Sequence, residues 1–235
     1  MNTVGQWMRL PALALACAAA MLIAGCQGVP RSSPATHNSA KWETVIQAYE
    51  AQDKTSAPAP GCIVFTGSSY IRLWTNLVVD FPAQPVVNRG FGGCHLADVF
   101  TYADRIIIPY QPRQIVIYAG GNDINSKKAP HTVFGDFVAL MTKLRAALPA
   151  TQLAFISCPP SPKRWAQTAD IRKTNALIAD YCRRHEITFI NTFDLMLGPD
   201  GLPRPDIYDE HQLHMNATGY AIWRKAVAPH LQSHL

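Results

Sequence analysis

A serine with the setting of a catalytic nucleophile stands early in the chain. The run over residues 63–66 is β-branched and aromatic, stops at Gly67 and is followed by Ser68 and Ser69. A serine on a tight turn from strand to helix exposes its hydroxyl, and the first helical amides face any oxyanion that forms there. Ser69 is therefore predicted to be a nucleophile. The competing role is that Ser68 or Ser69 caps a helix over residues 70–79.

Three later segments hold the other residue types that such chemistry needs. They are Asn-Arg-Gly-Phe-Gly-Gly at 88–93, Gly-Gly-Asn-Asp at 120–123 and His-Gln-Leu-His-Met-Asn at 211–216. Taken in this order, the four segments resemble the blocks of the GDSL/SGNH hydrolase family of serine esterases and lipases. The resemblance covers about residues 60–228. It implies that serine, glycine, asparagine and histidine converge at one end of a parallel sheet.

The family pattern assigns a role to each matching residue. The resemblance implies that Ser69 is the nucleophile and that His214 is the general base, which withdraws the serine proton and returns it to the leaving alcohol. It also implies an oxyanion hole built from the backbone amides of Ser69 and Gly93 and the side-chain amide of Asn122. Each donor of this kind typically lowers the barrier by about 3–4 kcal/mol. Gly93 and Asn122 also have the simpler interpretation of turn residues.

The chain departs from the family at two positions. Ser68 replaces the aspartate of Gly-Asp-Ser, and His211 replaces the aspartate that usually stands three residues before the catalytic histidine. Three accounts are open. Asp209 or Glu210 reaches His214 from a shifted loop, a backbone carbonyl orients His214 and leaves a dyad, or catalysis is weakened. Asp209 ranks first.

His211 has two further interpretations. Its ring could hydrogen-bond to His214, and repulsion between the two protonated rings would then lower activity at acidic pH. The spacing His211-x-x-His214 could also place two imidazoles on one metal ion, as in a metal-dependent hydrolase. No carboxylate or cysteine set with ligand spacing accompanies the pair. We therefore predict neither a metal nor another cofactor.

Residues 159–165 form a proline-rich loop after the fourth expected strand. It is expected to overhang the same sheet edge, with Arg164 as an anion contact and Trp165 as a wall of the substrate pocket. The other interpretation is a plain connector.

Strand-like and helix-like runs alternate along the chain. After a lead-in helix over 42–52, short apolar runs typical of buried strands occupy residues 62–66, 85–88, 114–118, 152–157 and 187–191. This βα repeat predicts an α/β fold, a three-layer α/β/α sandwich with a central parallel sheet of about five strands, SGNH-hydrolase-like or flavodoxin-like. Ligands of such sheets lie at the carboxyl ends of the strands.

The first 40 residues suggest export. Residues 1–25 have one basic residue, Arg9, before an apolar run that ends at Ala-Gly-Cys. They read as a signal peptide, and the junction resembles a bacterial lipobox with lipidation at Cys26. Residues 26–40 are expected to be a lipid-anchored flexible tether, and residues 41–235 a single hydrolase domain. By resemblance, Gln27 favours the outer membrane, facing the periplasm.

Charge and cysteine content argue against two classes of ligand, nucleic acid and zinc. The chain has 21 basic and 16 acidic residues, and loss of Arg9 leaves 20 against 16, a net charge of +4. This mild excess without basic runs does not indicate nucleic-acid binding. Besides Cys26, cysteines at 62, 94, 158 and 182 match no zinc spacing and are expected to be small buried hydrophobes.

Together these features predict a lipid-anchored serine hydrolase of the bacterial cell envelope. It would cleave a carboxylic ester of the short-acyl, acetyl-sugar or lysophospholipid type through an acyl-enzyme on Ser69. The alternative is a catalytically degenerate lipoprotein of the same fold that binds ligands or has a structural role, for which His211 is the main observation.

Overall fold

A computed structural model describes residues 1–2 and 38–231. Apart from its first two residues, the predicted signal peptide lies outside the described residues, as do Cys26 and most of the predicted tether. The five strands are β1 (Ile63–Gly67), β2 (Val86–Gly90), β3 (Gln114–Tyr118), β4 (Gln152–Ile156) and β5 (Thr188–Ile190). The α-helices are α1 (Glu43–Thr55), α2 (Ser69–Arg72), α3 (Leu77–Asp80), α4 (Leu96–Ile106), α5 (Gly121–Asn125), α6 (Pro130–Ala147), α7 (Thr168–Arg184) and α8 (Ala217–Val227).

The strands form one sheet in the order β2-β1-β3-β4-β5, and every neighbouring pair is parallel. Every residue of β1 and β3, the two central strands next to each other, is buried. Strands covered on both faces read as continuous apolar runs, which is why their positions could be predicted to within one or two residues. The predicted five-stranded parallel sheet is confirmed.

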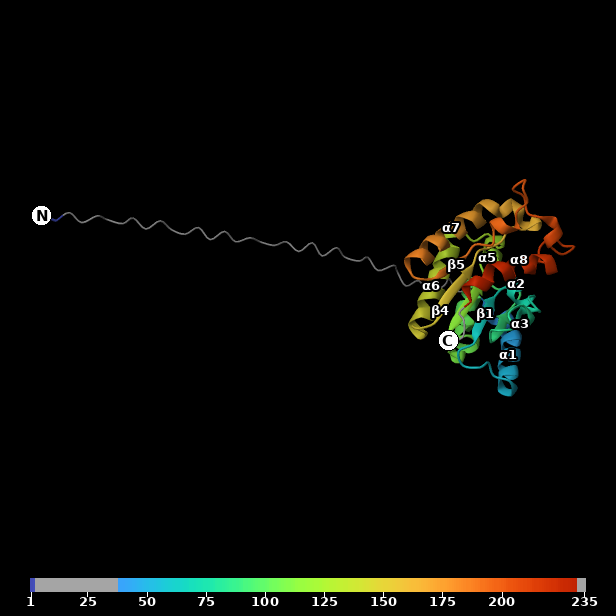
Figure 1. Ribbon diagram of the computed structural model, residues 1–235, viewed down its shortest axis with the longest axis horizontal. Coiled ribbons are helices and arrows are strands. Elements are labelled where there is room, and N and C mark those ends of the chain that lie inside the picture. The colour runs from blue at the N-terminus through green and yellow to red at the C-terminus, as the bar shows by residue number, and fades with distance from the viewer. Residues whose placement is uncertain (3–37, 232–235) are drawn as a thin grey trace. The chain divides into compact units, whose positions relative to one another are not determined.

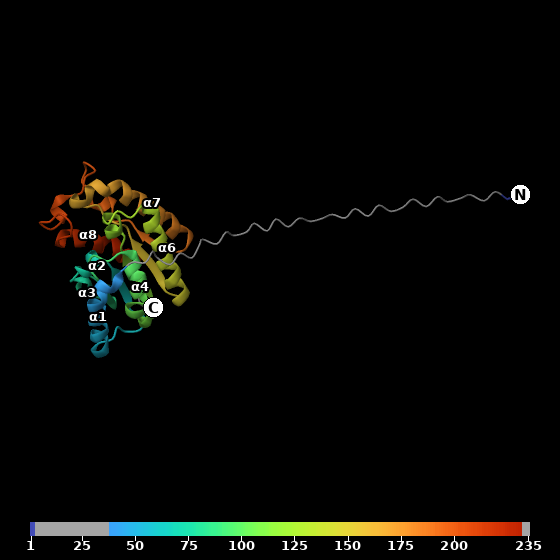
Figure 2. The ribbon, with the colours of Figure 1, turned by 180° about the vertical axis from the view of Figure 1, so that it is seen from behind.

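Helices lie on both sides of the sheet (Figure 1). Along one face α4, α6 and α7 pack in series, as the view from behind shows (Figure 2), and α1 packs against α4. On the other face, the Trp223 ring of α8 contacts Tyr70, Trp74 and Tyr118. The predicted three-layer arrangement is therefore confirmed. Among the described residues, no helix combines the length and apolar character needed to cross a bilayer.

The helix predicted over residues 70–79 is two short helices, α2 and α3, so this prediction was wrong. Asn88 in the middle of β2 donates a hydrogen bond to the Ile71 carbonyl at 2.7 Å. In a longer helix that carbonyl would accept from residue 75. Trp74 is 1% exposed and its Nε1 donates to Asp80 at 2.6 Å. The chain turns after α2 because these side chains hold it against β2.

The packed part of the chain begins before residue 41, where the domain was expected to start. A 3-10 helix covers Ser39–Trp42, and Ser39 is buried. The Ser39 hydroxyl donates to Asp98 at 2.6 Å, and the Tyr102 hydroxyl donates to the Ser39 carbonyl at 2.7 Å. These two bonds join the lead-in segment to α4, a pairing across about 60 residues that sequence spacing does not reveal.

The cysteines at 62, 94, 158 and 182 are free thiols and all are buried. This agrees with their expected role as small hydrophobic residues. Burial raises the pKa of the Cys94 thiol well above its ordinary range and that of Cys158 to about 12. Because the thiolate is the reactive species, these thiols are chemically quiet.

Gly67 ends β1 in a conformation that excludes a side chain. Its φ is +123°, and a Cβ atom there would lie 1.8 Å from the Tyr118 carbonyl oxygen. We expect Gly67→Ala to lower the free energy of unfolding by about 3 kcal/mol or more, because backbone would have to move. Chemical denaturation measures this change.

Gly135→Ala is the matched control. Gly135 lies inside α6 with open space around its α-carbon. The same substitution should there stabilise the protein by about 0.5–1 kcal/mol, because alanine loses less backbone entropy in a helix than glycine. Equal effects at the two positions would contradict our interpretation of the Gly67 turn.

Candidate active site

The turn after β1 presents two serines with different surroundings. Ser68 is buried, and its amide donates to the Tyr118 carbonyl at 2.8 Å. Ser69 begins α2, is half-buried and lines a cavity of about 480 Å³. The cavity lies at the carboxyl ends of β1 and β3, where the sequence places the site. Only the second serine of the pair therefore faces a space that a substrate could enter.

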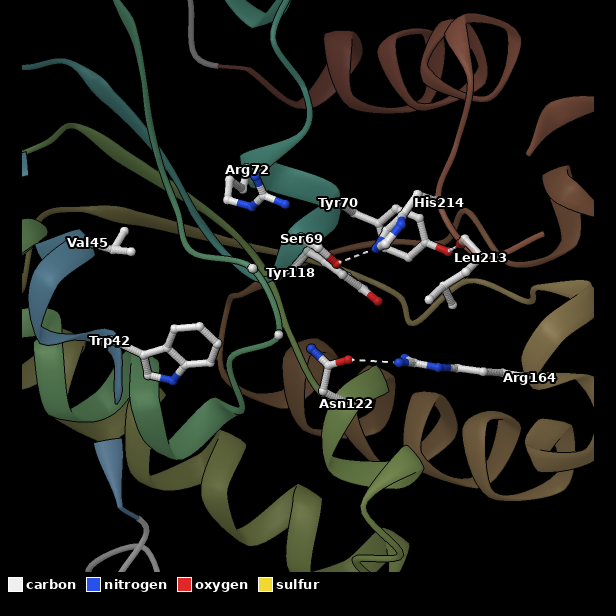
Figure 3. Close-up of a pocket in the computed structure, with 12 residues that line it drawn as sticks. Trp42, Val45, Ser69, Tyr70, Arg72, Tyr118, Asn122, Arg164, Leu213 and His214 are labelled. Atoms are coloured by element: carbon white, nitrogen blue, oxygen red, sulfur yellow. Dashed lines mark hydrogen bonds between the residues drawn. The ribbon is translucent and has the colours of Figure 1, made fainter. Parts of the chain in front are cut away.

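The His214 ring approaches the Ser69 hydroxyl. His214 Nε2 and Ser69 Oγ are 3.1 Å apart, within hydrogen-bond distance (Figure 3). His214 lies in the loop before α8, and the Tyr70 hydroxyl donates to the neighbouring Leu213 carbonyl. Asn216 caps α8 by accepting from the amides of Thr218 and Gly219. These contacts hold the loop on the serine.

Asp209 occupies the position of the third member of a triad. Its Oδ2 is 3.6 Å from His214 Nδ1. Its Oδ1 accepts from the amides of Leu213 and His214 at 3.1 and 3.2 Å, and its own amide donates to the His214 carbonyl at 2.7 Å. Gln212 completes this tight loop with a φ of +55°. A carboxylate five residues before the histidine thus faces its ring, because the intervening loop folds back on itself.

Burial and nearby charge set the protonation of this pair. Burial lowers the pKa of His214, and the charges of Arg164 and Arg72 lower it further, against the opposing effect of the Asp209 carboxylate. Burial alone would raise the pKa of Asp209, but the two amide hydrogen bonds and the His214 charge outweigh it and lower the pKa. Near neutral pH, Asp209 is therefore ionised and His214 is neutral, the forms in which a base can accept the Ser69 proton.

His211 and Glu210 do not take part in this arrangement. The His211 side chain is 71% exposed and its Nε2 is 3.6 Å from Glu210 Oε1. The alternative in which the His211 ring bonds to His214 does not occur among the described residues, because the loop turns His211 to solvent. No group of three or more histidine, cysteine or acidic side chains in residues 38–231 could hold a metal ion.

Asn122 and Gly93 line the same cavity as Ser69. Gly93 has a φ of +79°, which favours glycine, and a Cβ there would lie 3.2 Å from the Trp42 ring. Within residues 38–231, neither the Ser69 nor the Gly93 amide donates to a protein acceptor. Both amides are thus left for a ligand oxygen, as the prediction requires.

The side-chain amide of Asn122 is already engaged. Its Nδ2 donates to Ser68 Oγ at 2.6 Å and to the Cys94 carbonyl at 3.1 Å, so both amide hydrogens have acceptors. Donation to an oxyanion would have to replace the Ser68 hydroxyl as an acceptor. This competition arises from the serine at position 68, where the family pattern often has aspartate.

Arg164 holds Asn122 from the other side. Its guanidinium donates to Asn122 Oδ1 at 3.0 Å and to the Gly121 carbonyl at 3.1 Å (Figure 3). A flipped Asn122 amide would put its NH₂ group against this cation, so the contact defines which end of the amide faces Ser68. Sequence reasoning assigned Arg164 to the pocket, and the structure places it there with its donors directed at the protein.

The aromatic wall of the cavity comes from a different residue than expected. Trp165 is partly buried against the core and does not line the cavity, so the prediction of a Trp165 wall was wrong. Trp42 and Val45, from the lead-in segment, line it instead. Trp42 packs edge-on against Phe91 with ring centroids 5.9 Å apart. No motif marks Trp42, because its role depends on the docking of the first helix.

The sequence resembles known hydrolases over most of its length. Residues 59–222 match the GDSL-like Lipase/Acylhydrolase family, which confirms the resemblance. A GDSL esterase/lipase of Oryza sativa subsp. japonica is 26% identical over 151 residues, which are 55% of this chain. The matched region is 56% of that relative, so the chain corresponds to little more than half of its length.

Solved structures share the fold at low sequence identity. A GDSL-like lipase from Bacteroides thetaiotaomicron has a TM-score of 0.69 and 21% identity, over 79% of this chain and 96% of that one. An acetyl-xylooligosaccharide esterase mutant from Geobacillus stearothermophilus has a TM-score of 0.60 and 13% identity, over 73% and 94% of the two chains.

The position of Asp209 generates a test of its role. We expect Asp209→Asn to lower kcat for ester hydrolysis by about 10³–10⁴-fold, because His214 loses the charge that stabilises its protonated form. The same change should move the acidic limb of the kcat/KM profile to lower pH. The limb reports His214, whose pKa burial already holds below its ordinary value. The Asp209 carboxylate raises the pKa of His214, so its removal lowers that pKa further.

Glu210→Gln and His211→Asp are the matched controls. Glu210 is 86% exposed and His211 faces solvent, so neither substitution should change kcat by more than about threefold. An Asp209→Asn enzyme with normal turnover would show that Asp209 is not the orienting acid.

Proposed function

Because the chain belongs to the GDSL-like lipase/acylhydrolase family, we propose that it is a serine esterase that cleaves carboxylic esters through an acyl-enzyme on Ser69. The observation that carries the proposal is the alignment of Ser69, His214 and Asp209 at 3.1 and 3.6 Å. A nucleophile, a neutral base and an ionised orienting group in series are the parts that acyl transfer needs.

The chemistry proceeds in two halves. Ser69 Oγ attacks the ester carbonyl carbon while its proton passes to His214 Nε2, and the carbonyl electron pair moves onto oxygen. Collapse of this intermediate breaks the bond to the alcohol oxygen, which takes the proton from Nε2. Water then repeats the sequence on the acyl-enzyme, releasing the acid and freeing Ser69.

The two free amides of Ser69 and Gly93 are suited to stabilise the oxyanion. Both belong to residues that line the cavity, and neither has an acceptor within residues 38–231. Asn122 is the third donor of the proposal, once the oxyanion replaces Ser68 Oγ on its Nδ2. Preorganised donors cost little reorganisation during reaction, and each typically contributes about 3–4 kcal/mol.

The position of Asp209 favours an enzyme over a degenerate binding protein. The main observation for the degenerate alternative is His211 at the usual aspartate position. The geometry supplies a carboxylate to His214 from Asp209 instead, so His211 alone no longer argues for lost activity.

We propose short acyl esters, such as acetyl esters, as substrates. The cavity of about 480 Å³ is closed on one side by Trp42 and Val45. Such a volume lies in the lower half of the range for small-molecule sites, which favours a compact ester. The structural relative that acts on acetylated xylo-oligosaccharides is in keeping with this choice. Lysophospholipids and acylated sugars remain within the proposed ester class.

We expect Ser69→Ala to abolish hydrolysis of 4-nitrophenyl acetate, with kcat lowered by about 10⁵–10⁶-fold, because no other group can form the acyl-enzyme. A serine-directed fluorophosphonate should label the wild-type protein on Ser69, as peptide mass spectrometry can establish.

Ser68→Ala is the comparison variant. It removes the adjacent hydroxyl, which contacts Asn122 and not His214. This protein should still take the fluorophosphonate label on Ser69. A label on Ser68, or undiminished turnover by Ser69→Ala, would refute the assignment of the nucleophile.

We also propose that the protein is an envelope lipoprotein, anchored through Cys26 and facing the periplasm from the outer membrane. The proposal rests on the apolar run and the Ala-Gly-Cys junction at residues 24–26. Metabolic labelling with a palmitate analogue should mark the wild-type chain and spare Cys26→Ser. Equal labelling of both proteins would contradict it. Fractionation of the labelled cells would show which membrane holds the protein.

A further inference from the structure

The cavity beside Ser69 carries positive charge without acidic compensation. Of the described residues that line it, two are arginines, Arg72 and Arg164, and none is aspartate or glutamate. Asp209 lies behind His214 and accepts hydrogen bonds from the loop that carries it. A cavity lined by charge of one sign concentrates ligands of the opposite sign.

The two arginines differ in what they already bind. Arg164 donates to Asn122 Oδ1 and to the Gly121 carbonyl. Within residues 38–231, the guanidinium of Arg72 has no hydrogen-bond or ion-pair partner, and its side chain is exposed. Arg72 is therefore the cavity cation whose donors are open to a ligand.

The base of Arg72 is held firmly beside the nucleophile. It is the last residue of α2, three positions after Ser69, and its amide donates to the Ser68 carbonyl. Its guanidinium lies over Gly92, where a Cβ atom would be only 2.6 Å from Arg72 Nε. Figure 3 shows Arg72 on the side of Ser69 away from His214. The absence of a side chain at Gly92 thus gives Arg72 its place at the cavity wall.

We propose that this cavity selects esters that carry an anionic group, and that Arg72 is the residue that binds the anion. The inference rests on the hydrolytic function proposed above and specifies its substrate class. A guanidinium has five donors in a planar fork that matches a carboxylate or phosphate, and no protein carboxylate at the cavity competes for it.

The anion can belong to either half of the ester, so two pairs of probes are needed. On the acyl side, mono-4-nitrophenyl adipate is compared with its neutral methyl ester. On the alcohol side, 4-acetoxybenzoate is compared with methyl 4-acetoxybenzoate. Within each pair the scissile bond is of the same type and the remote carboxylate becomes a neutral methyl ester. Each rate is divided by that of hydroxide hydrolysis of the same ester, because the para substituent also changes the leaving phenol. The measured quantity is the ratio of kcat/KM for the charged and neutral member of a pair.

The full chain should prefer the charged member of at least one pair by about 10-fold at low salt, the range of a hydrogen-bonded charge pair. Arg72→Gln should bring that ratio to about 1, and Arg72→Glu should invert it. Arg72→Lys should retain part of the preference, because it keeps the charge and loses the fork. The pair that responds identifies whether the anion lies in the acyl or the alcohol part.

Lys225→Gln serves as the charge-matched control. It removes one positive charge from α8, at an exposed residue that does not line the cavity. Its ratio should equal that of the wild-type chain. The preference should also shrink when salt rises from about 0.05 M to about 0.5 M, because an exposed pair is screened. Measurements at about pH 8 keep His214 neutral in every variant, since its pKa lies below its ordinary value.

The outcomes separate the two proposals. If neutral esters turn over in a Ser69-dependent way but Arg72→Gln leaves both ratios unchanged, the anion preference is wrong and the esterase function stands. If Ser69→Ala hydrolyses all four esters as well as the wild-type chain does, the proposed function fails. Equal loss of preference in Arg72→Gln and Lys225→Gln would also overturn the assignment to Arg72.

Discussion

The contact between Gly67 and the Tyr118 carbonyl is the constraint on which the site depends. β1 and β3 are so close at their carboxyl ends that only a glycine fits at position 67. The chain leaves β1 there and directs Ser69 into the cavity, while Ser68 bonds to the same carbonyl. The backbone geometry of the two central strands thus determines where the nucleophile lies.

The sequence predicted this part of the structure well for a physical reason. Strands buried on both faces need continuous apolar runs, and these runs mark β1 and β3 in the sequence. Prediction from the sequence was less complete in the loop before α8. Asp209 was ranked first among several candidates, but only its hydrogen bonds to the Leu213 and His214 amides show how it reaches the ring. This loop conformation depends on a left-handed backbone at Gln212, which a glutamine in the sequence does not predict.

The features that the sequence did not predict depend on contacts between residues far apart in the chain. Trp42 reaches the cavity because Ser39 and Asp98 join the lead-in segment to α4. Trp165, near Arg164 in the sequence, turns toward the core instead. The helix expected after Ser69 stops early because the Asn88 side chain donates a hydrogen bond to the Ile71 carbonyl. Each of these outcomes is a tertiary hydrogen bond or packing choice that overrides local propensity.

The buried thiols bear on how the protein withstands its surroundings. Cys62, Cys94, Cys158 and Cys182 each lie within the core, without a disulfide among the described residues. Disulfide exchange needs an accessible thiolate, and burial denies both accessibility and ionisation to these side chains. These four thiols therefore add no disulfide to the stability of the folded domain, and their burial protects them from exchange with thiols and disulfides outside it.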